Sequence, residues 1–189
     1  MQSEVLIAGF GGQGVLFAGQ ILTYAGMDNG KQVTWMPSYG PEMRGGTANC
    51  TVIIADEEIG SPMVRNPKAA ILMNLPSLDK YESTIFPGGV LIVNSSLVNR
   101  EVARKDLDSV AIPAQEIAEL IGNRRLLNIV MLGALIEKLP VLSLEDIEKA
   151  LDTHLPERHR RLLPSNIQAL RKGAAYARGE PVFEEFGIK

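Results

Sequence analysis

The sequence predicts an α/β fold, namely a doubly wound, Rossmann-like three-layer sandwich with a mostly parallel sheet, a hairpin insert and a helical C-terminal part. Short apolar runs alternate with amphipathic helical segments along residues 5–112. A glycine-rich turn, Gly9-Phe10-Gly11-Gly12-Gln13-Gly14, directly follows the first apolar run. Residues 114–178 then carry helical patterns alone. Alternating strands and helices require right-handed crossovers, so helices cover both faces of the sheet.

Length and composition predict a single domain over residues 1–189. With 189 residues and 46% hydrophobic content, the chain can bury one sizeable core. A net charge of -3 lacks the basic field that attracts nucleic acid. The first residues carry no basic region, and the apolar run at residues 5–8 ends at glycine, so neither a signal peptide nor a membrane anchor is expected. We therefore expect a cytoplasmic protein that binds neither nucleic acid nor membrane.

The first elements form a βα unit followed by a second strand. Residues 5–9 are continuously apolar, as in a buried parallel strand, and residues 13–29 follow as a helix with one apolar face. Gly30 is placed to end that helix. Residues 32–36 are predicted as a strand that Pro37 breaks.

The rest of the chain continues this alternation and then becomes helical. Residues 47–55 are strand-like, and residues 59–63 are expected to return beside them as the hairpin insert. Later strands are expected at residues 69–73, 90–93 and 110–112, and later helices at residues 75–82, 115–121, 128–138, 144–151 and 165–178. The apolar segment 129–136 is too short to span a bilayer, so we assign it to the core.

The spacing Gly9-x-Gly11-x-x-Gly14 lies between a predicted strand and a predicted helix, where it has a physical role. Gly9 permits a tight turn, Gly11 lets a ligand approach the backbone, and Gly14 lets the helix and the strand pack closely. Free N–H groups and the positive dipole end at the helix start favour a phosphate. Alternatively, the three glycines only form a tight turn beneath a closely packed helix.

A dinucleotide site also needs an acidic residue at the end of the second strand, where it holds a ribose hydroxyl. This chain has Pro37 and Ser38 there, which disfavours NAD. Arg44 lies nearby in the sequence and can accept a ribose phosphate instead. NADP and coenzyme A (CoA) therefore stay open.

The segment from Pro37 to Gly46 combines turn formers with one acid and one base. The guanidinium of Arg44 is a planar fork suited to phosphate or carboxylate, and Glu42 can hold it in place. Because parallel strands end at one sheet edge, we expect a polar set there that comprises Gly11, Gly12, Gln13, Ser38, Tyr39, Arg44, Asn74, Asn94 and Ser95. Alternatively, the segment is a rigid surface loop with a Glu42–Arg44 ion pair, and the two asparagines are turn residues.

Several catalytic and metal-binding patterns are missing from the sequence. The lone Cys50 excludes an internal disulfide and an iron–sulfur cluster held by this chain alone, and we interpret it as a small buried side chain. There is no P-loop, no Gly-x-Ser-x-Gly elbow and no Gly-Asp-Gly motif. His154 and His159 lie in a basic stretch that we interpret as a solvated connection, with a docking patch as the alternative. We assign no catalytic residue and no metal ligand.

Four segments together resemble the gamma subunit of 2-oxoacid:ferredoxin oxidoreductases: the glycine turn with Val15, the segment 37–46, Asn128-Ile129-Val130-Met131-Leu132-Gly133-Ala134, and Asn166-Ile167-Gln168-Ala169-Leu170-Arg171-Lys172-Gly173. The resemblance covers nearly the whole chain. It implies an anaerobic complex that oxidatively decarboxylates a 2-oxoacid to an acyl-CoA and reduces ferredoxin. The implied partners are alpha and beta subunits with thiamine diphosphate and Mg, a ferredoxin-like delta subunit with iron–sulfur clusters, and ferredoxin itself.

The resemblance also implies a supporting role for this chain, which is expected to be inactive alone and to bind no cofactor firmly. Its implied task is to help admit CoA, with an anion site that comprises Gly9, Gly11, Gly12, Gln13, Gly14, Ser38, Tyr39, Glu42, Arg44 and Gly45. Tyr39 and Met43 are closer to the 2-oxoglutarate type than to the pyruvate type, although branched-chain and aromatic 2-oxoacids stay open. The alternatives are a stand-alone NADP-dependent reductase and a purely structural scaffold subunit.

Overall fold

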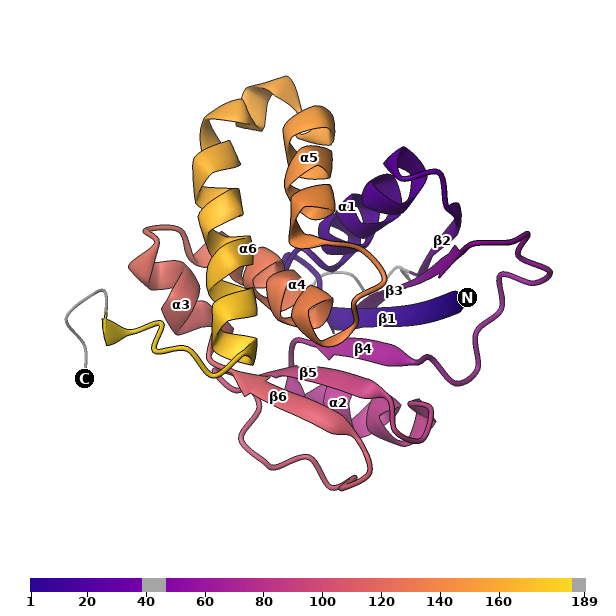
Figure 1. Cartoon of the computed structure of the whole chain (residues 1–189). Coiled ribbons are helices and arrows are strands. Elements are labelled where there is room, and N and C mark those ends of the chain that lie inside the picture. The colour runs from indigo at the N-terminus through magenta and orange to yellow at the C-terminus, as the bar shows by residue number, and fades with distance from the viewer. Residues whose placement is uncertain (39–46, 185–189) are drawn as a thin grey trace.

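The structure, a computed structural model, describes residues 1–38 and 47–184 and is built on one six-stranded sheet (Figure 1). The strands are β1 (Gln2–Phe10), β2 (Gln32–Ser38), β3 (Thr47–Ala55), β4 (Ala69–Leu72), β5 (Val90–Asn94) and β6 (Asp108–Ile112). Their order is β2-β3-β1-β4-β5-β6. The strands β1, β4, β5 and β6 are parallel, whereas β3 runs antiparallel to both β1 and β2. The predicted α/β class is confirmed.

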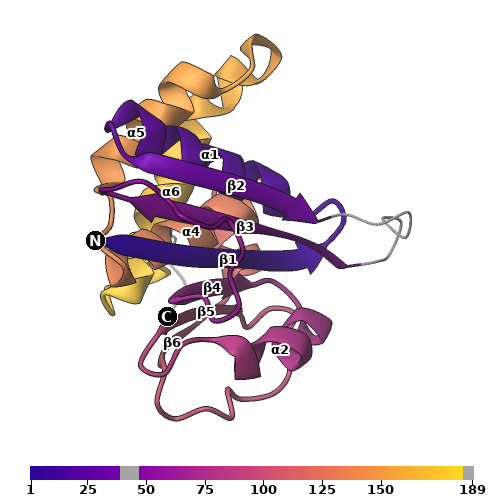
Figure 2. The ribbon, with the colours of Figure 1, turned by 90° about the vertical axis from the view of Figure 1, so that its right-hand side faces the viewer.

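Helices cover both faces of the sheet, but unequally (Figure 2). They are α1 (Val15–Asp28), α2 (Leu75–Tyr81), α3 (Ala114–Leu120), α4 (Leu127–Lys138), α5 (Leu144–His154) and α6 (Leu163–Ala177), with 3-10 turns at Glu82–Thr84, Arg124–Leu126 and Glu157–Leu162. All of these helices except α2 contribute to the larger core, and α2 packs on the opposite face. Residues 129–136 of α4 are all buried, which confirms their assignment to the core.

The prediction that residues 59–63 pair with residues 47–55 as a hairpin insert is wrong. The strand β3 pairs with β2 on one side and with the full length of β1 on the other, from Gln2 opposite Ala55 to Phe10 opposite Thr47. Residues 59–63 form no strand. The side chains of β3 that point towards α1 are apolar and buried. A position between two other strands therefore buries more of β3 than a hairpin at the edge of the sheet would. The short segment that follows contains Gly60 and Pro62, which weaken strand pairing.

The prediction that Pro37 ends the second strand is also wrong. The strand β2 continues through Pro37 to Ser38, with Pro37 opposite Cys50 of β3. Because β2 is at the edge of the sheet, it has a strand neighbour on one side only. An edge strand tolerates a residue without an N–H group, which a central strand does not.

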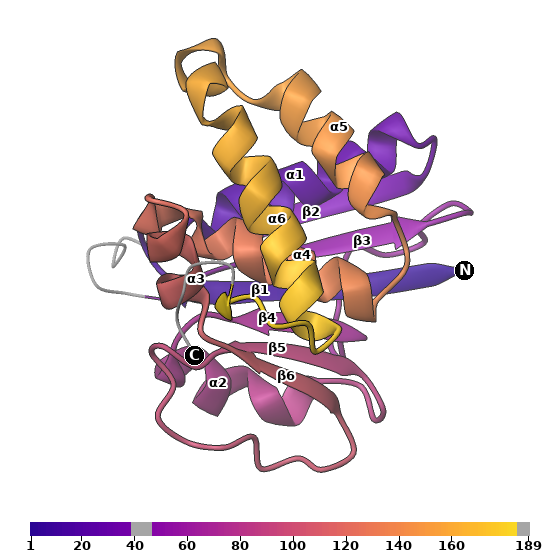
Figure 3. The ribbon, with the colours of Figure 1, turned by 60° about the vertical axis from the view of Figure 1, so that its left-hand side comes forward.

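The helices α4 and α6 cross with their backbones in contact (Figure 3). A Cβ atom at Gly133 of α4 would overlap the carbonyl group of Leu170, and one at Gly173 of α6 would overlap the carbonyl group of Val130. Two glycines on facing helix surfaces therefore allow an approach that any larger residue prevents. Both glycines belong to the segments that carry the family resemblance.

Replacing Gly173 with alanine is expected to lower the free energy of unfolding by about 1–3 kcal/mol, because the new methyl group overpacks the crossing. Urea denaturation of the purified chain measures the change. Gly60→Ala is the matched control, since a Cβ there would meet no atom within 4 Å; it should shift stability by less than about 0.5 kcal/mol. Equal stability of Gly173→Ala and the wild type would contradict the close crossing.

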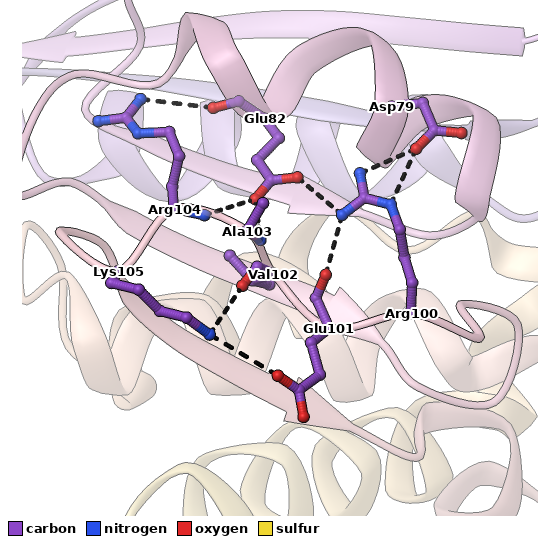
Figure 4. Close-up of polar contacts among 8 residues, drawn as sticks. All are labelled: Asp79, Glu82, Arg100, Glu101, Val102, Ala103, Arg104 and Lys105. Carbon is purple, nitrogen blue, oxygen red and sulfur yellow. Dashed lines mark hydrogen bonds and ion pairs between the residues drawn. The ribbon is translucent and has the colours of Figure 1, made fainter.

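Residues 95–107 connect β5 to β6 as a loop without a helix, and Glu82 binds this loop (Figure 4). The Glu82 carboxylate accepts hydrogen bonds from the N–H groups of Ala103 at 2.5 Å and Arg104 at 2.9 Å. Its second oxygen lies 2.9 Å from the Arg100 guanidinium. Burial raises the pKa of Glu82, but these hydrogen bonds and charges outweigh it, so the pKa lies below its usual value.

Glu82→Gln is expected to destabilise the protein by about 1–3 kcal/mol at pH 7, because a neutral amide replaces a buried acceptor of several hydrogen bonds. The folded pKa is depressed, so the stabilisation is complete above the unfolded pKa of about 4.3 and is lost as the pH falls through the folded value. Thermal melts at about six pH values between roughly pH 3 and pH 7 would measure this loss of stabilisation. Glu101→Gln, at a 94% exposed side chain, is the control. If the difference in Tm between Glu82→Gln and the wild type does not become smaller at low pH, the charge of Glu82 is not the source of the stabilisation.

Candidate functional site

The candidate residues that the structure describes lie at the edge of the sheet where β1, β2, β4, β5 and β6 end. Since β3 is antiparallel to both of its neighbours, β2 ends at the same edge as β1. Ser38 is exposed and lies opposite Asn49, and Thr47 lies opposite Phe10. The predicted site residues Tyr39, Glu42, Arg44 and Gly45 fall outside the described residues. Ser38 and Thr47, the described residues that flank segment 39–46 in the sequence, therefore both lie at this edge.

The glycine turn uses its glycines differently from the sequence prediction. Gly12 and Gly14 have positive φ angles, 96° and 78°, so they make the tight turn. Gly9 is buried in β1, where a Cβ would lie 2.7 Å from Gln13 Oε1 and 2.9 Å from Met73 Cβ. The close neighbour of Gly14 is the side chain of Asn128 in α4 and not a strand.

The side chain of Gln13 closes the turn from within. Its Oε1 accepts a hydrogen bond from the Phe10 N–H at 2.5 Å, and its Nε2 lies 3.5 Å from the Met73 carbonyl oxygen. The Asn74 Nδ2 lies 3.4 Å from Gln13 Oε1, and the Asn94 Nδ2 donates to the Met73 oxygen at 3.3 Å. These amides link the ends of β1, β4 and β5, next to the point between β1 and β4 where the connections change direction along the sheet.

The interpretation of Asn74 and Asn94 as turn residues is confirmed. The Asn74 Oδ1 accepts the Ser77 N–H at 2.9 Å and so caps α2, and the Asn94 Oδ1 accepts the Ser96 N–H at 3.3 Å. Both side chains are buried. Ser95 is exposed at the same edge. The polar set expected here is thus divided between residues that build turns and residues that face solvent.

A pocket of about 260 Å³ lies on the other flank of the turn, towards β3. Its lining comprises Phe10, Gly11, Gly12, Gly14, Val15, Leu16, Phe17 and Ala48. The helix α1 begins here after Gly14, and no described side chain caps it. The first helix N–H groups and the positive end of the dipole therefore lie at a pocket whose described lining is otherwise apolar. An anion with an attached apolar group matches this lining.

The strand order weighs against the dinucleotide alternative. In the dinucleotide fold the second strand lies beside the first, and its end supplies the ribose ligand. Here the antiparallel β3 separates β2 from β1, and the residue at the end of β2 is Ser38. The end of β2 therefore lacks the ribose-binding acid, and β2 does not lie directly beside β1.

Cys50 lies inside the larger core, which confirms its interpretation as a buried side chain. Its Sγ is 3.6 Å from the Val15 carbonyl oxygen at the start of α1. Burial raises the pKa of the thiol to about 12, so the reactive thiolate is suppressed near neutral pH.

The two histidines separate in the structure. His159 is exposed in the turn Glu157–Leu162, as a solvated connection predicts. His154 at the end of α5 is different, because its ring stacks on Tyr24 of α1 at 4.1 Å and its Nε2 lies 2.9 Å from Asp28 Oδ2. Its interpretation as part of a solvated connection is therefore wrong, since it joins α5 to α1.

The described part of the chain has neither a membrane-spanning helix nor a cluster of metal-ligand side chains. Within residues 1–38 and 47–184, none of the helices has the length and apolar character that crossing a bilayer requires. The same residues bring together no group of three or more His, Cys, Asp or Glu side chains that a metal ion would need.

Comparison with known proteins places the chain in a family. It belongs to the pyruvate ferredoxin/flavodoxin oxidoreductase family, whose model matches residues 4–176. Within that family the chain is of the gamma-subunit type of 2-oxoacid:ferredoxin oxidoreductases, which confirms the resemblance.

Three similar proteins give the details. The ketoisovalerate oxidoreductase subunit VorA of Methanothermobacter thermautotrophicus is 37% identical over 93% of this chain, which spans only 36% of that protein. The 2-oxoglutarate synthase subunit KorC of Methanocaldococcus jannaschii is 36% identical over 94% of this chain and 95% of its own. A solved keto/oxoacid ferredoxin oxidoreductase gamma subunit from Geobacter sulfurreducens is 32% identical, with a TM-score of 0.80 over 94% of this chain and 99% of its own.

Proposed function

We propose that this chain serves a complex that oxidatively decarboxylates 2-oxoglutarate to succinyl-CoA and passes the electron pair to ferredoxin. In this complex the gamma subunit helps to admit CoA and carries out no bond-making step itself. Thiamine diphosphate with Mg is held by alpha and beta subunits, and the iron–sulfur clusters by a ferredoxin-like delta subunit. The single cysteine supports this division, because iron–sulfur clusters generally need four thiolates.

The uncapped start of α1, open to the pocket beside Gly12, is the observation that carries the CoA assignment. CoA combines phosphates, which suit free N–H groups at a helix start, with less polar parts that suit Phe10, Leu16 and Phe17. The described lining holds no cation. Arg44 precedes Thr47 by three positions in the sequence, Thr47 lies opposite Phe10, and we assign Arg44 to the phosphates.

The choice of 2-oxoglutarate rests on the match to KorC along nearly the whole of both chains. The form of segment 37–46, with Tyr39 and Met43, points the same way. The match to VorA makes ketoisovalerate the substrate to compare against.

Arg44→Ala and Gly12→Val, each in the assembled complex, are expected to raise the KM for CoA about tenfold and to leave the KM for the 2-oxoacid unchanged. The first removes a charge from the phosphates, and the second strains a residue at φ 96° beside the pocket. Arg65→Ala is the control, because Arg65 is exposed at the opposite edge of the sheet. Unchanged CoA kinetics in both variants, with assembly intact, would establish the scaffold role instead.

Affinity purification of the tagged chain from an anaerobic lysate should recover thiamine- and iron-containing partners. The recovered complex should reduce ferredoxin faster with 2-oxoglutarate than with ketoisovalerate or pyruvate. Recovery without a thiamine-binding partner would contradict the complex, and saturable NADPH binding by the isolated chain would favour the reductase alternative. Preference for ketoisovalerate would overturn only the substrate.

A further inference from the structure

Asn128 connects the helical layer to the glycine turn. It lies in the first turn of α4 and is 4% exposed. Its Nδ2 donates a hydrogen bond to the Gly14 carbonyl oxygen at 3.1 Å, across 114 positions of sequence. The same oxygen accepts the Ala18 N–H at 3.0 Å, the first hydrogen bond of α1. A Cβ at Gly14 would overlap the Asn128 carboxamide, so the two residues are also in steric contact.

The position of Asn128 depends on the packing of its own helix, α4, against α6. The helix α4 is held against α6 through the backbone contacts at Gly133 and Gly173. The Gln13 side chain accepts a hydrogen bond from the Phe10 N–H. Two amide side chains therefore bind the turn, Gln13 from its own sequence and Asn128 from α4.

We propose that Asn128 is the positioning residue of the site: it holds Gly14 in its left-handed conformation and so aims the first N–H groups of α1 at the pocket. Asn128 acts through Gly14 and touches no ligand. The link to CoA rests on the proposed function, whereas the effect on the turn does not. Because α4 also contacts α6, the hydrogen bond of Asn128 ties the glycine turn to the helical layer.

Asn166 offers a matched control. It lies in α6, is 3% exposed, and donates its Nδ2 to the Leu162 carbonyl oxygen at 2.8 Å. Asn166→Asp and Asn128→Asp therefore remove the same kind of buried donor, but only Asn128 reaches the turn. Asn128→Leu is a second variant, of similar size and without charge, in case the aspartate prevents folding.

Hydrogen exchange on the full chain tests the positioning. We expect the amides of Gln13 and Ala18, which are hydrogen-bonded within the turn, to exchange about tenfold faster in the Asn128 variants, and at the wild-type rate in Asn166→Asp, which should lower only Tm. Unchanged exchange at these two amides in a folded Asn128 variant would overturn the inference.

In the assembled complex, the Asn128 variants should raise the KM for CoA about three- to tenfold with little change in kcat at saturating CoA. If the Asn128 and Asn166 variants change kcat and the KM for CoA to the same extent, Asn128 has a merely structural role and the inference is overturned. If Arg44→Ala and Gly12→Val raise the KM for CoA and the Asn128 variants do not, the inference fails alone. If exchange changes but none of these variants alters the KM for CoA, the positioning of Gly14 is supported and the CoA assignment is overturned.

Discussion

The backbone contact between α4 and α6 is the constraint on which the rest of the helical face depends. Because Gly133 and Gly173 carry no Cβ, the two helices lie closer than ordinary side chains allow. The helix α4 is then buried along residues 127–136 and fills the space above the sheet. Its first turn reaches the start of α1, and α1 in turn receives α5 through the stacked pair Tyr24 and His154. The close crossing is thus linked to two further helices, α1 and α5.

This dependence explains the family-like segments near the C-terminus. The segment 128–134 contains Asn128, which binds the turn, and Gly133, which admits α6. The segment 166–173 contains Asn166, which binds its own helix start, and Gly173, which completes the crossing. None of these four residues faces the pocket beside Gly12. Their pattern therefore marks an architecture that supports a site at some distance in sequence.

Local pattern predicted the elements well and their partners poorly. The apolar runs and helical spacing located β1, α1, β4, α2 and β5 within a few residues, because alternation and length are properties of the local sequence. The pairing of β3 with β1 was not predicted, since it depends on contacts between residues 37 to 53 positions apart, from Phe10 with Thr47 to Gln2 with Ala55. Pro37 was misjudged for the same reason, because its tolerance follows from an edge position that only the complete sheet defines.

The site shows the same limit more sharply. The glycine spacing found the turn, but the role of each glycine depends on the sign of φ and on neighbours such as Met73 and Asn128, which are remote in sequence.

The insertion of β3 between β1 and β2 has a chemical consequence for the turn. In a dinucleotide fold, the flank of the turn next to β1 is occupied by the second parallel strand and its ribose-binding acid. Here that flank is the start of an antiparallel strand, with Thr47 opposite Phe10 and Ala48 in the pocket wall. The position of the ribose-binding acid, at the end of the second strand, is held here by Ser38 of β2, which β3 separates from β1. The fold thus has the glycine turn and the helix start of a nucleotide site, whereas the strand and the acid that bind the sugar are not beside that turn.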